Sequence, residues 1–377
     1  MSNKNEVTVP VNTPSRAYDV NVGRGILDNI GKITRASAGG SRACVITETN
    51  VGPLYAARVE SSLAAAGYEV STLTFPAGEQ NKRLSTLEGL LEGLAEAALT
   101  RDDVVIALGG GVTGDMAGLA AAMYLRGIQV VQAPTSLLAM VDSSVGGKVA
   151  VDLAHGKNLC GFFWQPSAVV ADVECLHTIS PELYTDSIGE VVKHAVLADP
   201  QMLADLTDHP MNGAGYPDEL VTRIVAKNIQ IKRDVVNADE KERGLRQTLN
   251  LGHTIGHGIE AASDFALGHG SCVAAGLCCM ARAACVKGWC KPGTRDAIVA
   301  AMAAQGLPTD TALAHDVIFD YMTHDKKRHG DSMNIVVPDE IGRVSVRKVT
   351  LAELRELVDL GCGCAAGNEP IPEGEAR

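Results

Sequence analysis

Short apolar runs alternate with helical segments between residues 41 and 134, and no other feature constrains the fold as strongly. The apolar runs are residues 41–47, 69–75, 103–108 and 129–134. The helical segments between them are residues 52–66, 82–98 and 116–125. The run that begins at Asp103 is almost continuously apolar, as strands buried on both faces are. Strands separated by helices favour a mainly parallel sheet, so we predict an α/β domain, joined by a strand pair in the alternating residues 7–22.

The pattern of apolar and polar residues changes at residue 180. Strand-like runs become rare, and helical periodicity continues to about residue 320. Ser180-Pro-Glu182 has the form of a helix N-cap followed by proline. The chain has 377 residues, which is too long for one ordinary core. We therefore predict an α/β domain over residues 1–179, a mostly α-helical domain over 180–360, and a disordered tail over 361–377.

A glycine-rich segment, Gly109-Gly-Gly-Val-Thr-Gly-Asp115, follows the buried strand and precedes a helix. Backbone N–H groups in such a turn can approach a phosphate closely, and the helix N-terminus favours its negative charge. The glycine spacing differs from the usual dinucleotide fingerprint. A tight turn that binds nothing is the alternative interpretation.

Residues 134–158 are rich in small side chains and place charged and amide groups beside glycines. These groups are Asp142, Lys148, Lys157 and Asn158. Lysines next to Gly-Gly turns can meet an anion with little steric hindrance. Ordinary surface lysines are the alternative. Further along, the dense charges of residues 232–234 and 239–243 predict a solvated segment, and Glu190 with Lys193 could be a surface ion pair one helical turn apart.

Arg246, Asn250, His253 and His257 recur at helical spacing and would lie on one face of a continuous helix. The spacing of the two histidines can place both imidazoles on one metal ion, with His269 or Glu190 as a third ligand. A metallopeptidase would need glutamate after the first histidine, where this chain has Thr254. A solvated polar face is the alternative.

Composition narrows the classes of partner. The formal net charge is −12, from 33 basic and 45 acidic residues, which argues against nucleic acid. No run of 18 apolar residues predicts a membrane span, and the N-terminus lacks the apolar core of a signal peptide. The 10 cysteines form no Cys-x-x-Cys pair, which favours reduced thiols and a cytoplasmic location.

Taken together and in order, these motifs resemble the 3-dehydroquinate synthase family from about residue 40 to residue 345. They are Gly109-Gly-Gly-Val-Thr-Gly-Asp115, Met140-Val-Asp-Ser-Ser-Val-Gly-Gly-Lys148, Gly156-Lys-Asn158, Gly189-Glu-Val-Val-Lys193, Asn250-Leu-Gly-His-Thr-Ile-Gly-His257 and Asp325-Lys-Lys327. The resemblance implies a dinucleotide-binding α/β domain and an α-helical domain that binds metal and substrate.

The resemblance also implies an activity. The family converts 3-deoxy-D-arabino-heptulosonate 7-phosphate, a sugar phosphate, to 3-dehydroquinate and phosphate. The reaction belongs to the shikimate pathway, which leads to chorismate and the aromatic amino acids. Its cofactors are NAD, used without net redox change, and one divalent metal ion, zinc or cobalt. We therefore expect a cytoplasmic lyase that forms a homodimer.

Site residues follow by match to the family's motifs. The implied metal ligands are Glu190, His253 and His269. The implied substrate-binding and catalytic residues are Asp142, Lys148, Asn158, Lys193, Lys232, Arg246, Asn250, His257, Lys326, and Arg126 reaching in from a neighbouring subunit. The phosphate would meet Arg126, Lys148, Asn158, His257 and one lysine of the 326–327 pair, with Lys326 favoured. The implied NAD contacts are Glu48, Glu79, Lys82, Gly110, Gly111, Val112, Asp115, Thr135, Ser136, Asp142 and Lys157.

Two positions depart from the family pattern, and several functions compete. Glu48 stands where aspartate is common, and Ser136 stands where threonine is common; each keeps its hydrogen-bonding oxygen. The alternatives are another sugar phosphate cyclase (forming aminodehydroquinate, 2-deoxy-scyllo-inosose or a valiolone), a metal-dependent alcohol or glycerol dehydrogenase, and an inactive binding protein. Lys232, Arg246 and Asn250 together favour a substrate with a carboxylate.

Overall fold

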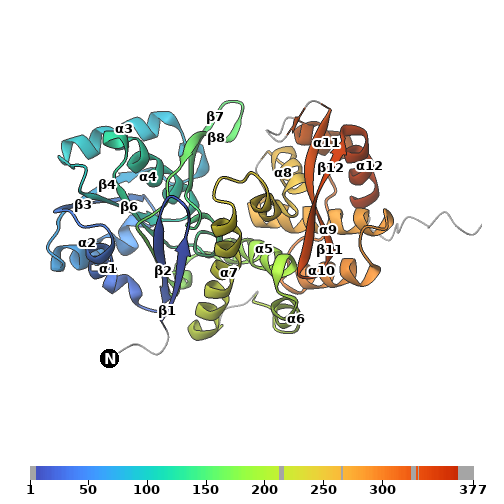
Figure 1. Cartoon of the computed structure of the whole chain (residues 1–377), viewed down its shortest axis with the longest axis horizontal. Coiled ribbons are helices and arrows are strands. Elements are labelled where there is room, and N and C mark those ends of the chain that lie inside the picture. The colour runs from blue at the N-terminus through green and yellow to red at the C-terminus, as the bar shows by residue number, and fades with distance from the viewer. Residues whose placement is uncertain (1–5, 212–215, 265, 324–327, 330, 364–377) are drawn as a thin grey trace, which may run out of the picture. The chain divides into compact units, whose positions relative to one another are not determined.

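The computed structural model describes residues 6–211, 216–264, 266–323, 328–329 and 331–363 of the chain. The chain divides into two compact units (Figure 1). The first unit comprises Met1–Ile179 and Gly215–Lys241, and the second comprises Ser180–Ala214 and Glu242–Arg377. The sequence predicted one change of domain, at residue 180. In the structure the chain also returns to the first unit for residues 215–241 before it re-enters the second. The predicted tail beyond residue 363 lies outside the described residues.

The first unit is built on a seven-stranded sheet with the order β1-β2-β9-β6-β5-β3-β4. Its strands are β1 (Val7–Asn12), β2 (Ala17–Gly23), β3 (Arg42–Glu48), β4 (Glu69–Phe75), β5 (Val104–Gly109), β6 (Gln129–Pro134) and β9 (Ala168–Asp172). β1 and β2 pair antiparallel, and the other pairs are parallel. This confirms the predicted α/β domain. Strand order reverses at β3, which has β4 on one side and β5 on the other.

Helices of the first unit are α1 (Ile30–Ser37), α2 (Gly52–Ala65), α3 (Leu84–Glu96), α4 (Gly111–Met123) and α7 (Asp218–Ala238). α4 starts five residues earlier than predicted, inside the glycine run. α7 contacts β1 and β2, and the apolar stripe of Val221, Val225 and Ile229 is buried. The small-residue stretch contains a structure that the sequence did not predict, a hairpin of β7 (Lys148–Leu153) and β8 (Gly156–Phe163).

The second unit is mainly helical, as predicted. Its elements are α5 (Pro181–Ala198), α6 (Pro200–Asp208), η6 (Leu245–Asn250), α8 (His253–Ala262), α9 (His269–Val286), α10 (Pro292–Ala304), α11 (His315–Thr323), α12 (Leu351–Gly361) and a sheet of β10 (Arg328–His329), β11 (Ser332–Glu340) and β12 (Arg343–Thr350). By length and composition α9 could cross a membrane, but 72% of it is buried. It packs against α5, α8, α10 and α12, so it is the central helix of a core (Figure 1).

The continuous helix predicted from Arg246 to His257 is wrong. The structure has a 3-10 helix, η6, that ends at Asn250, and a separate α-helix, α8, that begins at His253. Gly252 interrupts them with a φ of 78°, a left-handed conformation that glycine adopts readily. A Cβ at Gly252 would lie 2.8 Å from the Val273 carbonyl oxygen. The break therefore comes from the close packing of this turn on α9.

Candidate active site

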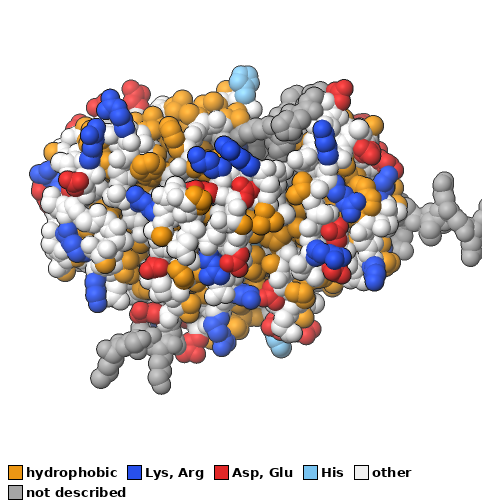
Figure 2. All heavy atoms as spheres, in the orientation of Figure 1, with side chains coloured by type: hydrophobic (Ala, Val, Ile, Leu, Met, Phe, Trp, Pro, Cys, Tyr) orange, Lys and Arg blue, Asp and Glu red, His pale blue; other side chains and the backbone are white. Residues whose placement is uncertain are grey.

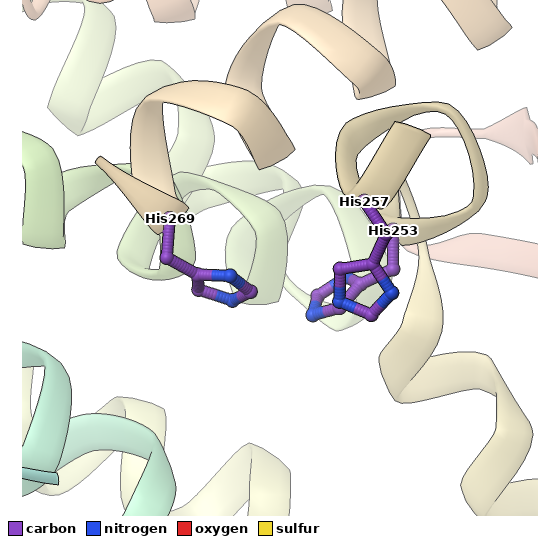
Figure 3. A group of neighbouring side chains, drawn as sticks. All are labelled: His253, His257 and His269. Carbon is purple, nitrogen blue, oxygen red and sulfur yellow. The ribbon is translucent and has the colours of Figure 1, made fainter. Parts of the chain in front are cut away.

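Three histidines of the second unit gather where α8 and α9 begin. His253 and His257 project from the first turns of α8, and His269 is the first residue of α9. Figure 3 shows the ring of His269 pointing toward the other two rings. The ring centroids are 5.1 Å apart for His253 and His257 and 5.3 Å apart for His253 and His269. One nitrogen from each ring lies within 4.8 Å of the others, close enough for a shared metal ion.

Glycines bring a carboxylate to the same place. A Cβ at Gly189 of α5 would lie only 2.2 Å from the carbonyl oxygen of Gly270 of α9. The two helices can therefore approach backbone to backbone, and the next residue on α5, Glu190, is fully buried beside the first residue of α9. Glu190 Oε1 is 3.5 Å from His253 Nε2 and 3.5 Å from His269 Nε2. The glycines of this motif are thus a packing requirement of the site.

This geometry fits a divalent metal ion. Within the described part of the chain, no hydrogen bond of ordinary geometry reaches either buried oxygen of Glu190. A separation of 3.5 Å is long for a hydrogen bond. Two tetrahedral ligand atoms about 2.0–2.1 Å from zinc are about 3.3 Å apart, which is close to the observed spacing. The outer nitrogens are also engaged, His253 Nδ1 with the Leu251 carbonyl oxygen at 3.1 Å and His269 Nδ1 with Glu260 at 3.2 Å.

Burial and neighbouring charges shift the pKa values of Glu190, His253 and His269 in different directions. Burial disfavours the charged carboxylate, but Lys193 and the two imidazoles hold the pKa of Glu190 well below its ordinary value. Burial and then the Lys193 charge hold the pKa of His253 well below its ordinary value, so this ring is neutral. Burial opposes a charge on His269, yet Glu190 and Glu260 raise its pKa to about 10. Glu190 and Glu260 therefore place a carboxylate on each side of this ring.

Other predicted residues of the second unit are buried or partly buried and have polar partners. Lys193 forms an ion pair with Glu190, and both are fully buried, so the alternative of a surface pair is wrong. Arg246 is among the largest fully buried side chains. Asn250 donates a hydrogen bond of 2.8 Å to Glu242. The sequence analysis missed Glu242 because it lies in a charge run that was predicted to be solvated.

The same charge run contributes buried groups to the first unit. Lys232 of α7 forms an ion pair of 2.8 Å with Asp142 and also donates to the Asp142 carbonyl oxygen. Glu240 accepts a hydrogen bond of 2.9 Å from Gln165. Both Lys232 and Glu240 are buried, so the prediction of a solvated segment is wrong for them. Their burial depends on tertiary packing, which local charge density does not predict.

The predicted nucleotide contacts of the first unit lie at the carboxyl ends of its strands. Glu48 ends β3, Gly110 follows β5, and Thr135 and Ser136 follow β6. The reversal of strand order between β4, β3 and β5 is where open α/β sheets bind nucleotides. Glu48 accepts backbone hydrogen bonds from Asn50 at 2.6 Å and from Val51 at 3.0 Å. Gly111 and Val112 supply the first N–H groups of α4, where an anion is favoured.

Charged and amide side chains of the first unit form a polar network. Lys82 forms an ion pair of 2.6 Å with Asp115 and donates to the Asn158 side chain. Glu79 is 3.9 Å from Lys82 and 3.6 Å from Lys157. Burial alone would lower the pKa of Lys82, but the charges of Asp115 and Glu79 raise it above its ordinary value. The network thus holds a charged ammonium group in a buried place.

Two predicted phosphate contacts lie on other elements of the first unit. Arg126 and Lys148 are exposed in the first unit, on η3 (Tyr124–Arg126) and β7. Arg126 has a φ of 68°. Lys326, with its neighbour Lys327, lies outside the described residues.

Comparison with known proteins finds one family in both parts of the chain. A family model described as 3-dehydroquinate synthase N-terminal matches residues 72–186, and one described as 3-dehydroquinate synthase C-terminal matches residues 187–328. A 3-dehydroquinate synthase of Lactiplantibacillus plantarum is 39% identical over 347 residues, covering 92% of this chain and 96% of the relative. A 3-dehydroquinate synthase of Geobacter metallireducens is 40% identical over 358 residues, covering 94% and 99%.

Solved structures with the same fold include enzymes of other specificity. A 2-deoxy-scyllo-inosose synthase, solved with carbaglucose-6-phosphate, NAD+ and Co2+, aligns with a TM-score of 0.86 at 26% identity and covers 94% of this chain and 100% of its own. A 2-epi-5-epi-valiolone synthase of Streptomyces hygroscopicus, with NAD+ and Zn2+, aligns with a TM-score of 0.79 at 23% identity, covering 91% and 96%. At that lower identity the likeness shows the fold alone.

Proposed function

Because this chain belongs to the 3-dehydroquinate synthase family, we propose how its residues divide the work of that reaction. The chain is an enzyme that converts 3-deoxy-D-arabino-heptulosonate 7-phosphate to 3-dehydroquinate and phosphate, with NAD and one divalent metal ion as cofactors. When bound, NAD would supply reversible hydride transfer with a ring carbon of the substrate, and the metal ion would supply polarisation of substrate oxygens. The oxidised ring has an acidic neighbouring C–H, which allows phosphate to leave by elimination.

The proposed metal ligands are Glu190, His253 and His269. Their support is the 3.5 Å spacing of the carboxylate oxygen from both Nε2 atoms, with both Nδ1 atoms already engaged. Three protein ligands leave further positions for substrate oxygens, as catalytic sites require. His257 lies in the same cluster but is assigned to the substrate phosphate, because the buried carboxylate completes the ligand set with a negative charge. The buried Glu190 oxygen, 3.5 Å from both Nε2 atoms, is the observation on which the proposal depends.

The other side chains hold the two charged ends of the substrate. Lys232, Arg246 and Asn250 would bind the carboxylate and hydroxyl end, because fixed cations and an amide donor match a carboxylate. Asp142 would hold Lys232 in place through the 2.8 Å ion pair. Lys193 would keep Glu190 ionised. The residues proposed for the phosphate are Arg126, Lys148, Asn158, His257 and Lys326. Positive charge near the leaving phosphate stabilises the charge that develops on it.

The proposed NAD contacts are those at the strand ends of the first unit. Glu48 would accept hydrogen bonds from ribose hydroxyls, and the N–H groups of Gly110, Gly111 and Val112 would meet the pyrophosphate. The remaining proposed contacts are Glu79, Lys82, Asp115, Thr135, Ser136, Asp142 and Lys157.

We also propose a homodimer through an apolar surface of the first unit. Leu125 of η3 and Phe162 and Phe163 of β8 are large apolar side chains that are 39%, 56% and 41% exposed. Figure 2 shows hydrophobic side chains on the surface over the β7–β8 hairpin. Arg126 follows Leu125 directly, so a second copy on this surface would receive Arg126. Phe163→Glu should convert a dimer to a monomer, measured by light scattering, whereas a variant that stays dimeric would contradict this surface.

We place the enzyme in the cytoplasm, on the shikimate pathway. Support comes from the cysteines within the described residues, which are free thiols and mostly buried.

The function is tested by phosphate release from three substrates. With heptulosonate phosphate, NAD and zinc, the protein should release phosphate without accumulating NADH. Stoichiometric NADH would indicate a dehydrogenase instead. Glucose 6-phosphate and sedoheptulose 7-phosphate test the alternative cyclases, one of which shares this fold with a TM-score of 0.86. Release from either of these, and not from heptulosonate phosphate, would overturn the assignment.

A further inference from the structure

A second carboxylate stands behind one of the proposed metal ligands. Glu260 Oε2 is 3.2 Å from Nδ1 of His269, and Glu190 Oε1 is 3.5 Å from Nε2 of the same ring. The two ring nitrogens face different directions, so Glu260 contacts the side of His269 that faces away from the proposed ion. Glu260 is buried, and burying a carboxylate is costly unless it is paired.

The position of Glu260 in the fold follows from α8. It lies seven residues after His253, which is two helical turns, so both project from one face of α8 toward the start of α9. The same helix thus supplies one proposed ligand directly and supports a second ligand on the neighbouring helix. The function proposed above gives Glu260 no role.

The backbone next to His269 is held by a separate contact, a cap on the first turn of α9. Asp186 of α5 accepts hydrogen bonds from the Gly270 nitrogen at 3.1 Å and the Ser271 nitrogen at 2.7 Å. These N–H groups belong to the first turn of α9 and would otherwise lack helical partners. Asp186 therefore fixes the backbone next to His269, while its ring orientation still depends on Glu260.

The contact between Glu260 and Nδ1 suits a histidine that binds a metal ion through Nε2. To offer the Nε2 lone pair to a metal, neutral His269 must carry its proton on Nδ1. A carboxylate that accepts a hydrogen bond from that proton fixes the tautomer and the ring plane and makes Nε2 a stronger donor. His253 has a weaker version of the same support, because its Nδ1 partner is the neutral Leu251 carbonyl oxygen at 3.1 Å.

We infer that Glu260 is a positioning residue for the metal site, which acts through His269 by fixing its tautomer and orientation. This inference rests on the proposed ligand set. Because Glu260 acts through another residue, its loss should weaken metal binding without changing which substrate is used.

Cobalt binding tests the inference directly. The apo protein is titrated with Co²⁺ in competition with a chelator, while the visible absorption of the bound ion is recorded. Glu260→Gln keeps the volume but removes the charge, and we expect the dissociation constant to rise about 10-fold. Glu260→Ala removes the contact, and we expect a rise of up to about 100-fold with a shifted cobalt spectrum. Both expectations concern metal affinity, not turnover.

Glu240→Gln is the matched control. Glu240 is also a buried glutamate, but it belongs to the first unit and accepts from Gln165 and Ser15. This variant should bind cobalt as the wild type does. If Glu260→Ala does not fold, the isosteric glutamine variant decides. An unchanged affinity and spectrum in Glu260→Gln would overturn the inference. Wild-type protein that binds cobalt but releases no phosphate would instead contradict the proposed function.

Discussion

The two units form their candidate sites in different ways. In the first unit several predicted nucleotide contacts follow neighbouring parallel strands, and those of Gly110, Gly111 and Val112 are backbone N–H groups. In the second unit the proposed ligands come from three helices, and each is a side chain. Their spacing depends on glycines that allow α5, α8 and α9 to approach one another closely.

This difference predicts different sensitivities. A site made of strand ends is fixed by the sheet itself, so a single side chain contributes only part of the binding. A site made of helix ends depends on every ligand and on the packing distance between the helices. The chain offers a probe for each unit, since it has two tryptophans, Trp164 in the first and Trp289 in the second.

The largest effect is expected at a proposed metal ligand. His253→Ala should lose the bound metal and lower the rate about 10³-fold, because the ion contributes several kcal/mol of transition-state stabilisation. Metal content and phosphate release measure this. His315→Ala is the control, because His315 pairs with Asp359 on the surface of the same unit. Full activity with the metal retained in His253→Ala would refute the ligand assignment.

A smaller effect is expected from the spacing of the helices. Gly189→Ala would place a Cβ 2.2 Å from the Gly270 carbonyl oxygen, so the helices must move apart. We expect a loss of about 1–3 kcal/mol of stability and weaker metal binding. The unfolding transition reported by Trp289 should shift. Gly89→Ala is the control, because nothing lies within 4 Å of that Cβ on α3, and helix propensity should add about 0.5–1 kcal/mol. Equal effects of the two variants would contradict the packing argument.

A single nucleotide contact should matter less. Glu48→Gln keeps one acceptor oxygen but loses the charge, so NAD affinity should fall about 5–10-fold, as for one weakened hydrogen bond. Titration of NAD by calorimetry measures this, with metal binding unchanged. Glu69→Gln, at an exposed glutamate of the same unit that pairs with Arg42, should leave NAD affinity unaltered. A complete loss of NAD binding in Glu48→Gln would show that the two sites are equally sensitive.

The smallest effect is expected on the stability of the first unit when the pH is lowered. Burial opposes ionisation of Asp103, but hydrogen bonds from the Arg42, Thr100 and Ser41 nitrogens hold its pKa below its ordinary value. A carboxyl whose pKa is depressed by folding stabilises the protein above its unfolded pKa, near 4, and this contribution is lost as the pH falls through the folded pKa. Below pH 4 the first unit should therefore lose stability. The unfolding transition reported by Trp164 measures this loss. Asp103→Asn should flatten this dependence, and an unchanged slope would contradict it.

The sequence predicted the first unit more completely than the second, for a physical reason. Strand periodicity and the position of a residue at a strand end are local properties, so the run around Asp115 was recognisable. The π-helix η4 (Ala139–Ser143) and the β7–β8 hairpin depend on tertiary contacts and were missed. In the second unit, resemblance supplied the ligand set, whereas helical periodicity alone suggested a pairing of His253 and His257.

Two failures had the same cause. Helical spacing of the polar residues around Gly252 predicts a continuous helix, but the backbone there is left-handed and its packing on Val273 leaves no room for a Cβ. Charged side chains are usually solvated, so the sequence predicts solvated Glu240 and Glu242. Glu240 instead accepts a hydrogen bond from Gln165, which is distant in sequence, and Glu242 accepts one from Asn250, eight residues further along. Neither kind of contact can be recognised from a local window of residues.

The return of the chain to the first unit has a consequence for synthesis. β1 and β2 are covered by α7, which is made after Ser180–Ala214 of the second unit. While the ribosome adds the roughly sixty residues from Ser180 to the end of α7, at ~5–20 residues per second, the nascent first unit remains without that helix for about 3–12 s. During this interval the apolar residues that later pack on Val225 and Ile229 are open to chaperones. Co-translational folding of the two units is therefore interleaved, and neither can be released as a finished domain before the other has begun.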